Sequence, residues 1–207
     1  ALARESVPSV REGGTEALGH FDSPEVVSAL MLALEDGARQ GRINAIEALG
    51  CTGSTNATMP IILAAKTDPR SSIRSAAVGA LGMLCDPRAV PTLEGFVRIG
   101  VHAGEAAWSL GHIGDPSAVP ALARAFDDKA AKDDRFEVAF ALEEIGDTNA
   151  VAALDAAMAK GKDNDRFASA CALAILGDRR GLPGLTNGVL EDWMKLAVCM
   201  SVARWDT

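Results

Sequence analysis

A four-residue phrase recurs along this chain at a nearly constant interval, and the repetition constrains the fold more than any other feature. The phrase is Glu-Ala-Leu-Gly at 16–19 and 47–50, Gly-Ala-Leu-Gly at 79–82 and Trp-Ser-Leu-Gly at 108–111. With two degenerate copies it provides six marker leucines, spaced 31, 32, 29, 32 and 31 residues apart: Leu18, Leu49, Leu81, Leu110, Leu142 and Leu173. A period of this length indicates one supersecondary unit copied along the chain, which builds a solenoid.

The composition predicts that each copy consists of two short helices. Ala and Leu dominate and Tyr is absent, which favours helix throughout. We expect helix A to end at the marker leucine, and a turn such as Gly-Asp-Pro at 114–116 to follow it. Asp in that turn caps helix B, whose first turn tolerates Pro. The predicted fold is an all-α, right-handed α-solenoid of about six and a half two-helix repeats.

The repeats divide the chain into approximate segments of one continuous domain over residues 1–207: 7–36, 37–68, 69–98, 99–128, 129–160, 161–192 and a partial repeat at 193–207. Neither end shows the polar capping repeat that closes natural solenoids, so we expect a fragment of a longer protein. Repeat four has Gly100 and Gly104 where its helix A should begin, and we expect a local bend or a frayed helix there.

The residue order within repeats three and four resembles the short HEAT-like repeats first described in phycobilisome lyases. The motif includes Asp68-Pro69, Ile73-Arg74, Ala80-Leu81-Gly82 and Asp86-Pro87. The resemblance covers essentially the whole chain and implies HEAT-like repeats. Bilin lyase subunits, a hydroxylase and many bacterial scaffolds share this repeat, so the resemblance implies fold more than activity.

Charge and hydropathy restrict the partners. The net charge is −8 and the pI about 4.9, so the long-range field repels nucleic acid and anionic lipid. No apolar run reaches the roughly 18 residues that span a membrane. The four cysteines show no metal-binding spacing, and we expect small buried or half-buried side chains in a reducing, cytoplasmic setting. They are Cys51, Cys85, Cys171 and Cys199.

Charged residues recur at two slots, and resemblance to HEAT arrays implies that they form a structural ladder between stacked repeats. The first slot, seven residues before the marker leucine, contains Arg11, Arg42, Arg74, Arg135 and Arg166, with Ala103 in repeat four. The second slot, in the turns, contains Asp22, Asp86, Asp115, Asp147 and Asp178. A charged functional site is the alternative interpretation of the same residues.

No catalytic, metal or cofactor site is predicted. The resemblance to HEAT-like repeats extends to a hydroxylase of the di-iron type, in which repeated His-Glu pairs supply the metal ligands. In this chain none of His20, His102 and His112 is followed by Glu. There is no Gly-x-Ser-x-Gly elbow and no phosphate-binding glycine motif.

Two apolar stripes are the candidate binding residues. The B-helix stripe comprises Met31, Leu32, Ile61 and Leu63, which we expect at the N-terminal end of the concave face; contact with a preceding repeat or core packing is the alternative. The A-helix stripe lies two residues before the marker leucine, where Glu16 and Glu47 give way to apolar residues. These are Trp108, Phe140 and Met200. A partner interface and a buried contact between repeats both remain open for it.

These observations predict a non-enzymatic scaffold that binds another protein or peptide of some basic character, with self-association as an open possibility. The resemblance implies an alternative: a bilin lyase subunit, or a chaperone that handles tetrapyrroles, working with a second HEAT-like partner. Nucleic-acid binding would need a basic concave face, which the acidic balance disfavours.

Overall fold

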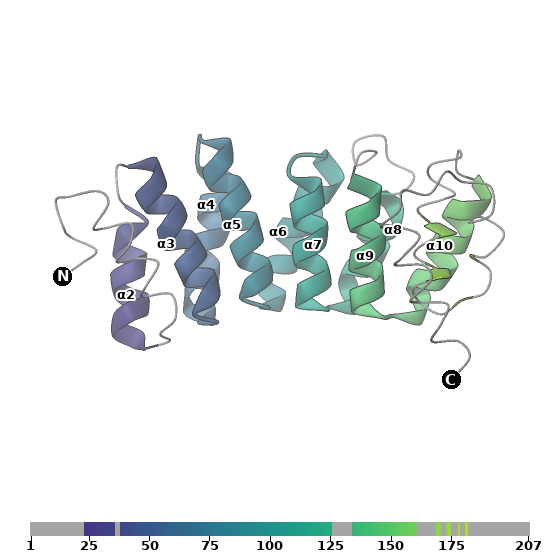
Figure 1. Cartoon of the computed structure of the whole chain (residues 1–207), viewed down its shortest axis with the longest axis horizontal. Coiled ribbons are helices and arrows are strands. Elements are labelled where there is room, and N and C mark those ends of the chain that lie inside the picture. Colours follow the sequence, from purple (N-terminus) through teal and green to yellow (C-terminus); the bar gives the residue numbers. More distant parts are fainter. Residues whose placement is uncertain are drawn as a thin grey trace, which may run out of the picture. The chain divides into compact units, whose positions relative to one another are not determined.

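The computed structural model describes residues 23–35, 38–125, 134–160, 169, 170, 173, 174, 178 and 181, and in these every regular element is an α-helix or a short 3₁₀ helix. The all-α prediction is confirmed (Figure 1). The chain divides into two compact units, residues 1–93 and 94–207, and the division falls inside helix α6 (Val90–Ile99). None of the described helices is both long and apolar enough to cross a membrane.

Unit 1 contains four α-helices: α2 (Pro24–Ala33), α3 (Arg39–Cys51), α4 (Thr58–Thr67) and α5 (Ser71–Met83). It also contains the 3₁₀ turns η2 (Thr55–Ala57) and η3 (Pro87–Ala89). In unit 2 the α-helices after α6 are α7 (Ala103–Ile113), α8 (Val119–Ala125), α9 (Arg135–Ile145) and α10 (Thr148–Lys160). The 3₁₀ turn η4 (Pro116–Ala118) lies between α7 and α8. The odd-numbered helices are the A helices and the even-numbered ones are the B helices.

The predicted turn chemistry is confirmed at two turns. Asp86 and Asp115 cap η3 and η4, each accepting a hydrogen bond from the backbone N–H two residues later, with Pro between them. The predicted end of helix A is wrong, because α3, α5, α7 and α9 all run two or three residues past the marker leucine. Cys51 and Cys85 follow that leucine and are exposed, which corrects their predicted burial; Cys171 and Cys199 lie outside the described residues.

The extra helical residues explain the recurring Ala-Leu-Gly. Within each unit the A helices pack side by side, α3 against α5 and α7 against α9 (Figure 1). A Cβ on Gly50 would lie 3.1 Å from the Cα and Cβ of Ala80, and one on Gly111 would lie 2.9 Å from the Cα of Ala141. The glycine after one marker leucine therefore faces the alanine before the next, and both must be small for the helices to approach this closely.

The core has two leucine-type positions per repeat. The marker leucines Leu49, Leu81, Leu110, Leu142 and Leu173 are fully buried. Twelve residues after each marker, the B helices contribute a second fully buried set: Leu30, Ile61, Leu93, Leu122 and Leu154. Burial of each such side chain stabilises the fold by about 1.5–3 kcal/mol. This second register was not recognised in the sequence analysis.

Repeat four begins with an irregular turn, at the place where its sequence predicts a local bend or a frayed helix. Gly100 and His102 both have left-handed backbones, with φ of 70° and 52°, and α7 starts only at Ala103. The slot that contains the recurring arginine elsewhere is thus the first helical residue here, and Ala103 is buried.

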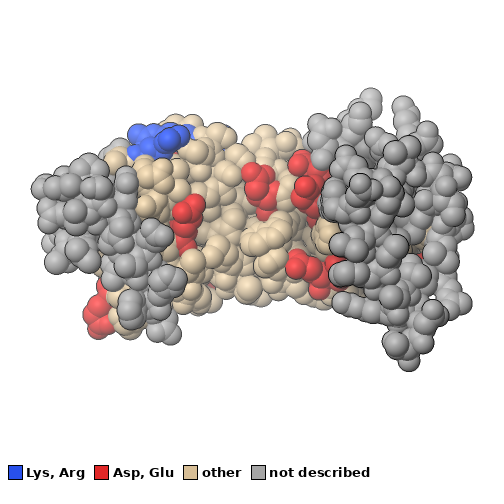
Figure 2. Space-filling model, in the orientation of Figure 1, with Lys and Arg blue, Asp and Glu red and all other residues tan. Residues whose placement is uncertain are grey.

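The surface is weakly charged over much of the face that Figure 2 shows. Acidic side chains lie in separate places on this face, and basic side chains gather in one place on unit 1. The excess negative charge that the composition predicts is therefore not concentrated in one patch of the described surface in this view.

Glycine-to-alanine variants test the A-helix contact. Gly111→Ala should destabilise the protein by about 1–3 kcal/mol, because its Cβ would overlap backbone atoms of α9. Gly79 provides the control: it lies inside α5 with no atom within 4 Å of an added Cβ, so Gly79→Ala should stabilise by up to about 1 kcal/mol through helix propensity. Thermal and chemical denaturation measure both. Equal effects of the two substitutions would contradict the proposed contact.

Candidate functional site

A groove of about 650 Å³ lies between α2 and α4 in unit 1. Each helix lines it with residues spaced i, i+3, i+4 and i+7, which places them on one helical face: Ser28, Met31, Leu32 and Glu35 on α2 and the turn after it, and Pro60, Leu63, Ala64 and Thr67 on α4. The two sets are 32 residues apart, one residue more than the spacing of the marker leucines Leu18 and Leu49. Leu34, Arg42 and Asp68 complete the lining.

Three of the four residues of the B-helix stripe meet in this groove. Leu32 is 52% exposed and Leu63 is 62% exposed, while Met31 is half-buried. Ile61 is fully buried, so its predicted place on a binding surface is wrong. The physical reason is its register: Ile61 occupies the core slot twelve residues after the marker leucine, whereas Leu32 and Leu63 both lie fourteen residues after it.

The polar part of the groove is built around Asp68, which lies in the linker between α4 and α5. Its carboxylate forms an ion pair with Arg42 (Nη2–Oδ2, 2.8 Å) and accepts a hydrogen bond from the Arg70 backbone N–H (2.9 Å). Its carbonyl oxygen accepts a hydrogen bond from Arg74 Nη1 at 2.9 Å. Asp68 is 8% exposed, and Arg42 Nε is buried without a hydrogen-bond partner.

These contacts revise the predicted ladder. The recurring Arg42 and Arg74 both meet Asp68, the last residue of repeat two, rather than a turn aspartate. The Arg42–Asp68 pair lies within repeat two, and Arg74 of repeat three bonds the Asp68 carbonyl oxygen across the repeat boundary. Asp147 and Asp178 are half-buried turn residues. Arg11, Arg166 and Asp22 lie outside the described residues, as does the side chain of Arg135.

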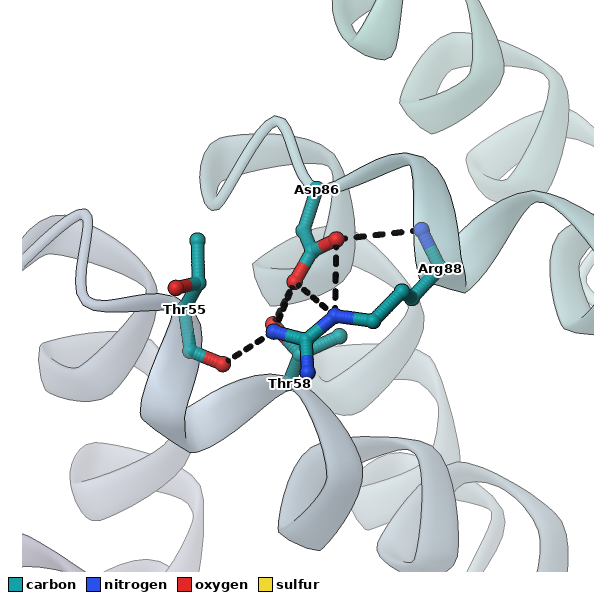
Figure 3. Close-up of polar contacts among 4 residues, drawn as sticks. All are labelled: Thr55, Thr58, Asp86 and Arg88. Atoms are coloured by element: carbon teal, nitrogen blue, oxygen red, sulfur yellow. Dashed lines mark hydrogen bonds and ion pairs between the residues drawn. The ribbon is translucent and has the colours of Figure 1, made fainter.

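Asp86 makes a second link between repeats, which Figure 3 shows. Its carboxylate accepts hydrogen bonds from Thr58 Oγ1 at 2.6 Å and from Arg88 Nε at 2.9 and 3.1 Å, and Arg88 Nη2 also bonds it. Arg88 Nη2 further donates to the Thr55 carbonyl oxygen at 2.7 Å. The turn of repeat three is thereby joined to the start of α4 in repeat two.

This environment stabilises the charged form of Asp86. The hydrogen bond from Arg88 lowers the pKa of Asp86 from 3.8 to about 2; burial opposes this change and the Thr58 hydroxyl supports it. Hydrogen bonds from the Ser117 backbone and side chain also lower the pKa of Asp115, and burial opposes this change.

The A-helix stripe forms a separate candidate surface in unit 2. Trp108 is 42% exposed on α7, and Phe140, in the same slot of α9, is half-buried; Met200 lies outside the described residues. The Trp108 ring stacks on His112 with a centroid separation of 3.8 Å. Within the described part of the chain, no three His, Cys, Asp or Glu side chains are placed to hold a metal ion.

Comparison with protein families identifies the class. Residues 30–103 match the family model for HEAT repeats, and residues 103–128 and 134–160 match the model for the PBS lyase HEAT-like repeat. Together these segments cover more than half of the chain, and with the stacked two-helix units they define a HEAT-repeat protein. More particularly, the repeats at 103–128 and 134–160 are similar to the PBS lyase HEAT-like type. Comparison with curated proteins gave no match.

A solved structure shows the same fold. A chain of the complex of CpcE and CpcF of phycocyanin lyase from Nostoc sp. PCC7120 matches with a TM-score of 0.61 and 23% identity, over 100% of this chain and 86% of that chain. Human deoxyhypusine hydroxylase in complex with glycerol matches with 19% identity over 99% of this chain and 82% of that one. Its TM-score of 0.42 is too low to support any conclusion.

Sequence reasoning missed Asp68, Thr58 and Arg88 as structural partners. Asp68 carried a signal, because the pair Asp68-Pro69 stands directly before helix A of repeat three. Thr58 carried none: its slot, nine residues after the marker leucine, contains Val90 and Val119 in the next two repeats.

The Asp86 link predicts acid sensitivity. Because the folded pKa lies below the unfolded one, the stabilisation is complete above about pH 4 and is lost as the pH falls toward 2. Asp86→Asn should cost about 1–3 kcal/mol at pH 7, since it weakens the bonds to Arg88 and Thr58, and should flatten the fall in stability between pH 4 and 2. Urea denaturation across this pH range measures both.

Asp115→Asn is the matched control, because Asn caps helices about as well as Asp. It should cost well under 1 kcal/mol. If the two variants lost equal stability, the bonds of Asp86 to Thr58 and Arg88 would not matter.

Proposed function

We propose that this protein is a non-enzymatic HEAT-repeat scaffold that binds a partner protein in the groove between α2 and α4. The observation that carries the proposal is the pair Leu32 and Leu63: large apolar side chains that are both more than half exposed and both line one concavity. Isolated exposed leucines are ordinary on protein surfaces, whereas apolar residues gathered in a groove are typical of binding sites.

The shape of the groove suits an amphipathic helix of the partner. Two parallel sets of residues at i, i+3, i+4 and i+7 form its walls, and a helix inserts its own apolar stripe into grooves of this kind. Met31 adds an adaptable side chain to the wall. Glu35 contributes an acidic group at the edge, while the Arg42–Asp68 ion pair is internally neutralised. A partner helix with leucine-type anchors and flanking basic residues fits these features.

The apolar groove is specific to the first pair of B helices. In the slot fourteen residues after the marker leucine, Leu32 and Leu63 are followed by Gly95 and Arg124 in the next two repeats. The core slot two residues earlier remains apolar in all of them. Stability therefore does not require leucine in the exposed slot, which supports a binding role.

A second candidate is a subunit of a bilin lyase or a tetrapyrrole-handling chaperone. The observation that favours it is the likeness in fold to a chain of the phycocyanin lyase complex, which extends over the whole of this chain. The groove volume lies within the range of small-molecule sites. Under this proposal the protein would act with a second subunit, and adding a bilin to the protein would shift the absorbance of the bilin.

Charge insertion into the groove tests the scaffold proposal. Leu32→Glu and Leu63→Glu should each reduce partner recovery at least about tenfold, because a carboxylate would be buried against the partner's apolar side chains. Both side chains are exposed in the free protein, so its thermal stability should change little. The measurement is quantitative affinity capture, with partners identified by mass spectrometry.

Met59→Glu is the control for this experiment. Met59 is on α4 and is 57% exposed, but it does not line the groove, so partner recovery should stay at the wild-type level. Unchanged recovery with the Leu32 and Leu63 variants would exclude the groove as the binding site. Sedimentation of the same proteins alone measures self-association.

A further inference from the structure

Trp108 is an exposed residue of α7 with acidic side chains nearby. One turn before it is Glu105, which is 50% exposed. One turn after it is His112, which stacks on the indole ring and places its Nδ1 3.1 Å from Oε2 of Glu144 on α9. The stacking holds an exposed aromatic ring in a defined orientation, and this lowers the entropy lost when a partner binds it.

Helix α9 repeats this arrangement beside α7. Phe140 occupies the slot of Trp108, with Glu137 three residues before it and Glu144 four residues after it. Glu137 approaches α7, since its Cγ is 3.5 Å from the point where a Cβ on Gly104 would lie. The aromatic pair is thus flanked by carboxylates near both ends of the two helices.

The described Asp, Glu, Lys and Arg side chains of α7 and α9 are all acidic, and the side chain of Arg135, the first residue of α9, lies outside the described residues. Among the described side chains of α7 and α9 there are four glutamates and no lysine or arginine. Figure 2 agrees: along α7 and α9 the acidic groups lie at two levels with neutral surface between them. Such a face attracts cations and repels phosphate groups and further copies of a chain with a net charge of −8.

We propose that the α7–α9 face binds an arginine-containing basic segment of a partner protein, with a guanidinium packed on the Trp108 ring and paired with Glu105 or Glu137. Arginine fits better than lysine because its planar, weakly hydrated guanidinium stacks on aromatic rings and pairs with carboxylates through two parallel hydrogen bonds. The site is in unit 2 and shares no residue with the groove of unit 1, so it is a second binding surface.

Binding of an acetylated hexa-arginine peptide, measured by isothermal titration calorimetry at low and physiological salt, tests this site. Trp108→Leu should weaken binding about three- to tenfold, whereas Trp108→Phe should retain more of it, because an aromatic face is what the cation needs. Glu105→Gln with Glu137→Gln should weaken binding severalfold at low salt and less at physiological salt. Hexa-lysine should bind more weakly than hexa-arginine.

Glu47→Gln is the matched control. Glu47 is exposed in the corresponding slot of α3 in unit 1, so its substitution removes one negative charge, half the change made by the double variant, without touching the site. It should leave binding at the wild-type level, and thermal unfolding should confirm that every variant is folded. Equal binding by wild type and Trp108→Leu, or an equal loss with Glu47→Gln, would overturn the proposal. Neither result would bear on the groove of unit 1, which the Leu32 and Leu63 variants test separately.

Discussion

The close contact of one A helix with the next is the constraint on which the rest of each unit depends. Gly50 meets Ala80, and Gly111 meets Ala141, at distances that leave no room for another methyl group. The marker leucines next to these residues are fully buried: Leu49, Leu81, Leu110 and Leu142. In unit 1 the B helices pack against the A helices that follow them, α2 on α3 and α4 on α5, and α2 and α4 form the walls of the groove.

Buried polar groups stabilise the turns and linkers between helices, whereas apolar contacts pack the helices against one another. Asp68 collects Arg42, Arg74 and the Arg70 backbone at one linker. Asp86 collects Thr58 and Arg88 at one turn. Each carboxylate is nearly inaccessible to solvent, and a buried polar group without hydrogen-bond partners would destabilise the fold. The links therefore order loops that have few apolar side chains of their own.

Function can occupy only the slots that stacking leaves free. In the B helices the slot fourteen residues after the marker leucine points into the groove, and it contains Leu32 and Leu63 in the first two repeats alone. In the A helices the slot two residues before the marker is outside the core, and it changes from Glu47 to Trp108. Neither apolar surface is required by the fold, because other repeats place small, polar or charged residues there.

The sequence by itself determined the repeat, the all-α class and the aspartate caps, because each depends on local spacing and local hydrogen bonds. It also selected Leu32, Leu63 and Trp108 as departures from the repeat. Only the tertiary structure decided that Ile61 belongs to the core, that Arg42 pairs with Asp68, and that helix A continues through Gly50. These outcomes depend on which atoms of separate helices come within contact distance. The spacing of residues along the sequence does not give such distances.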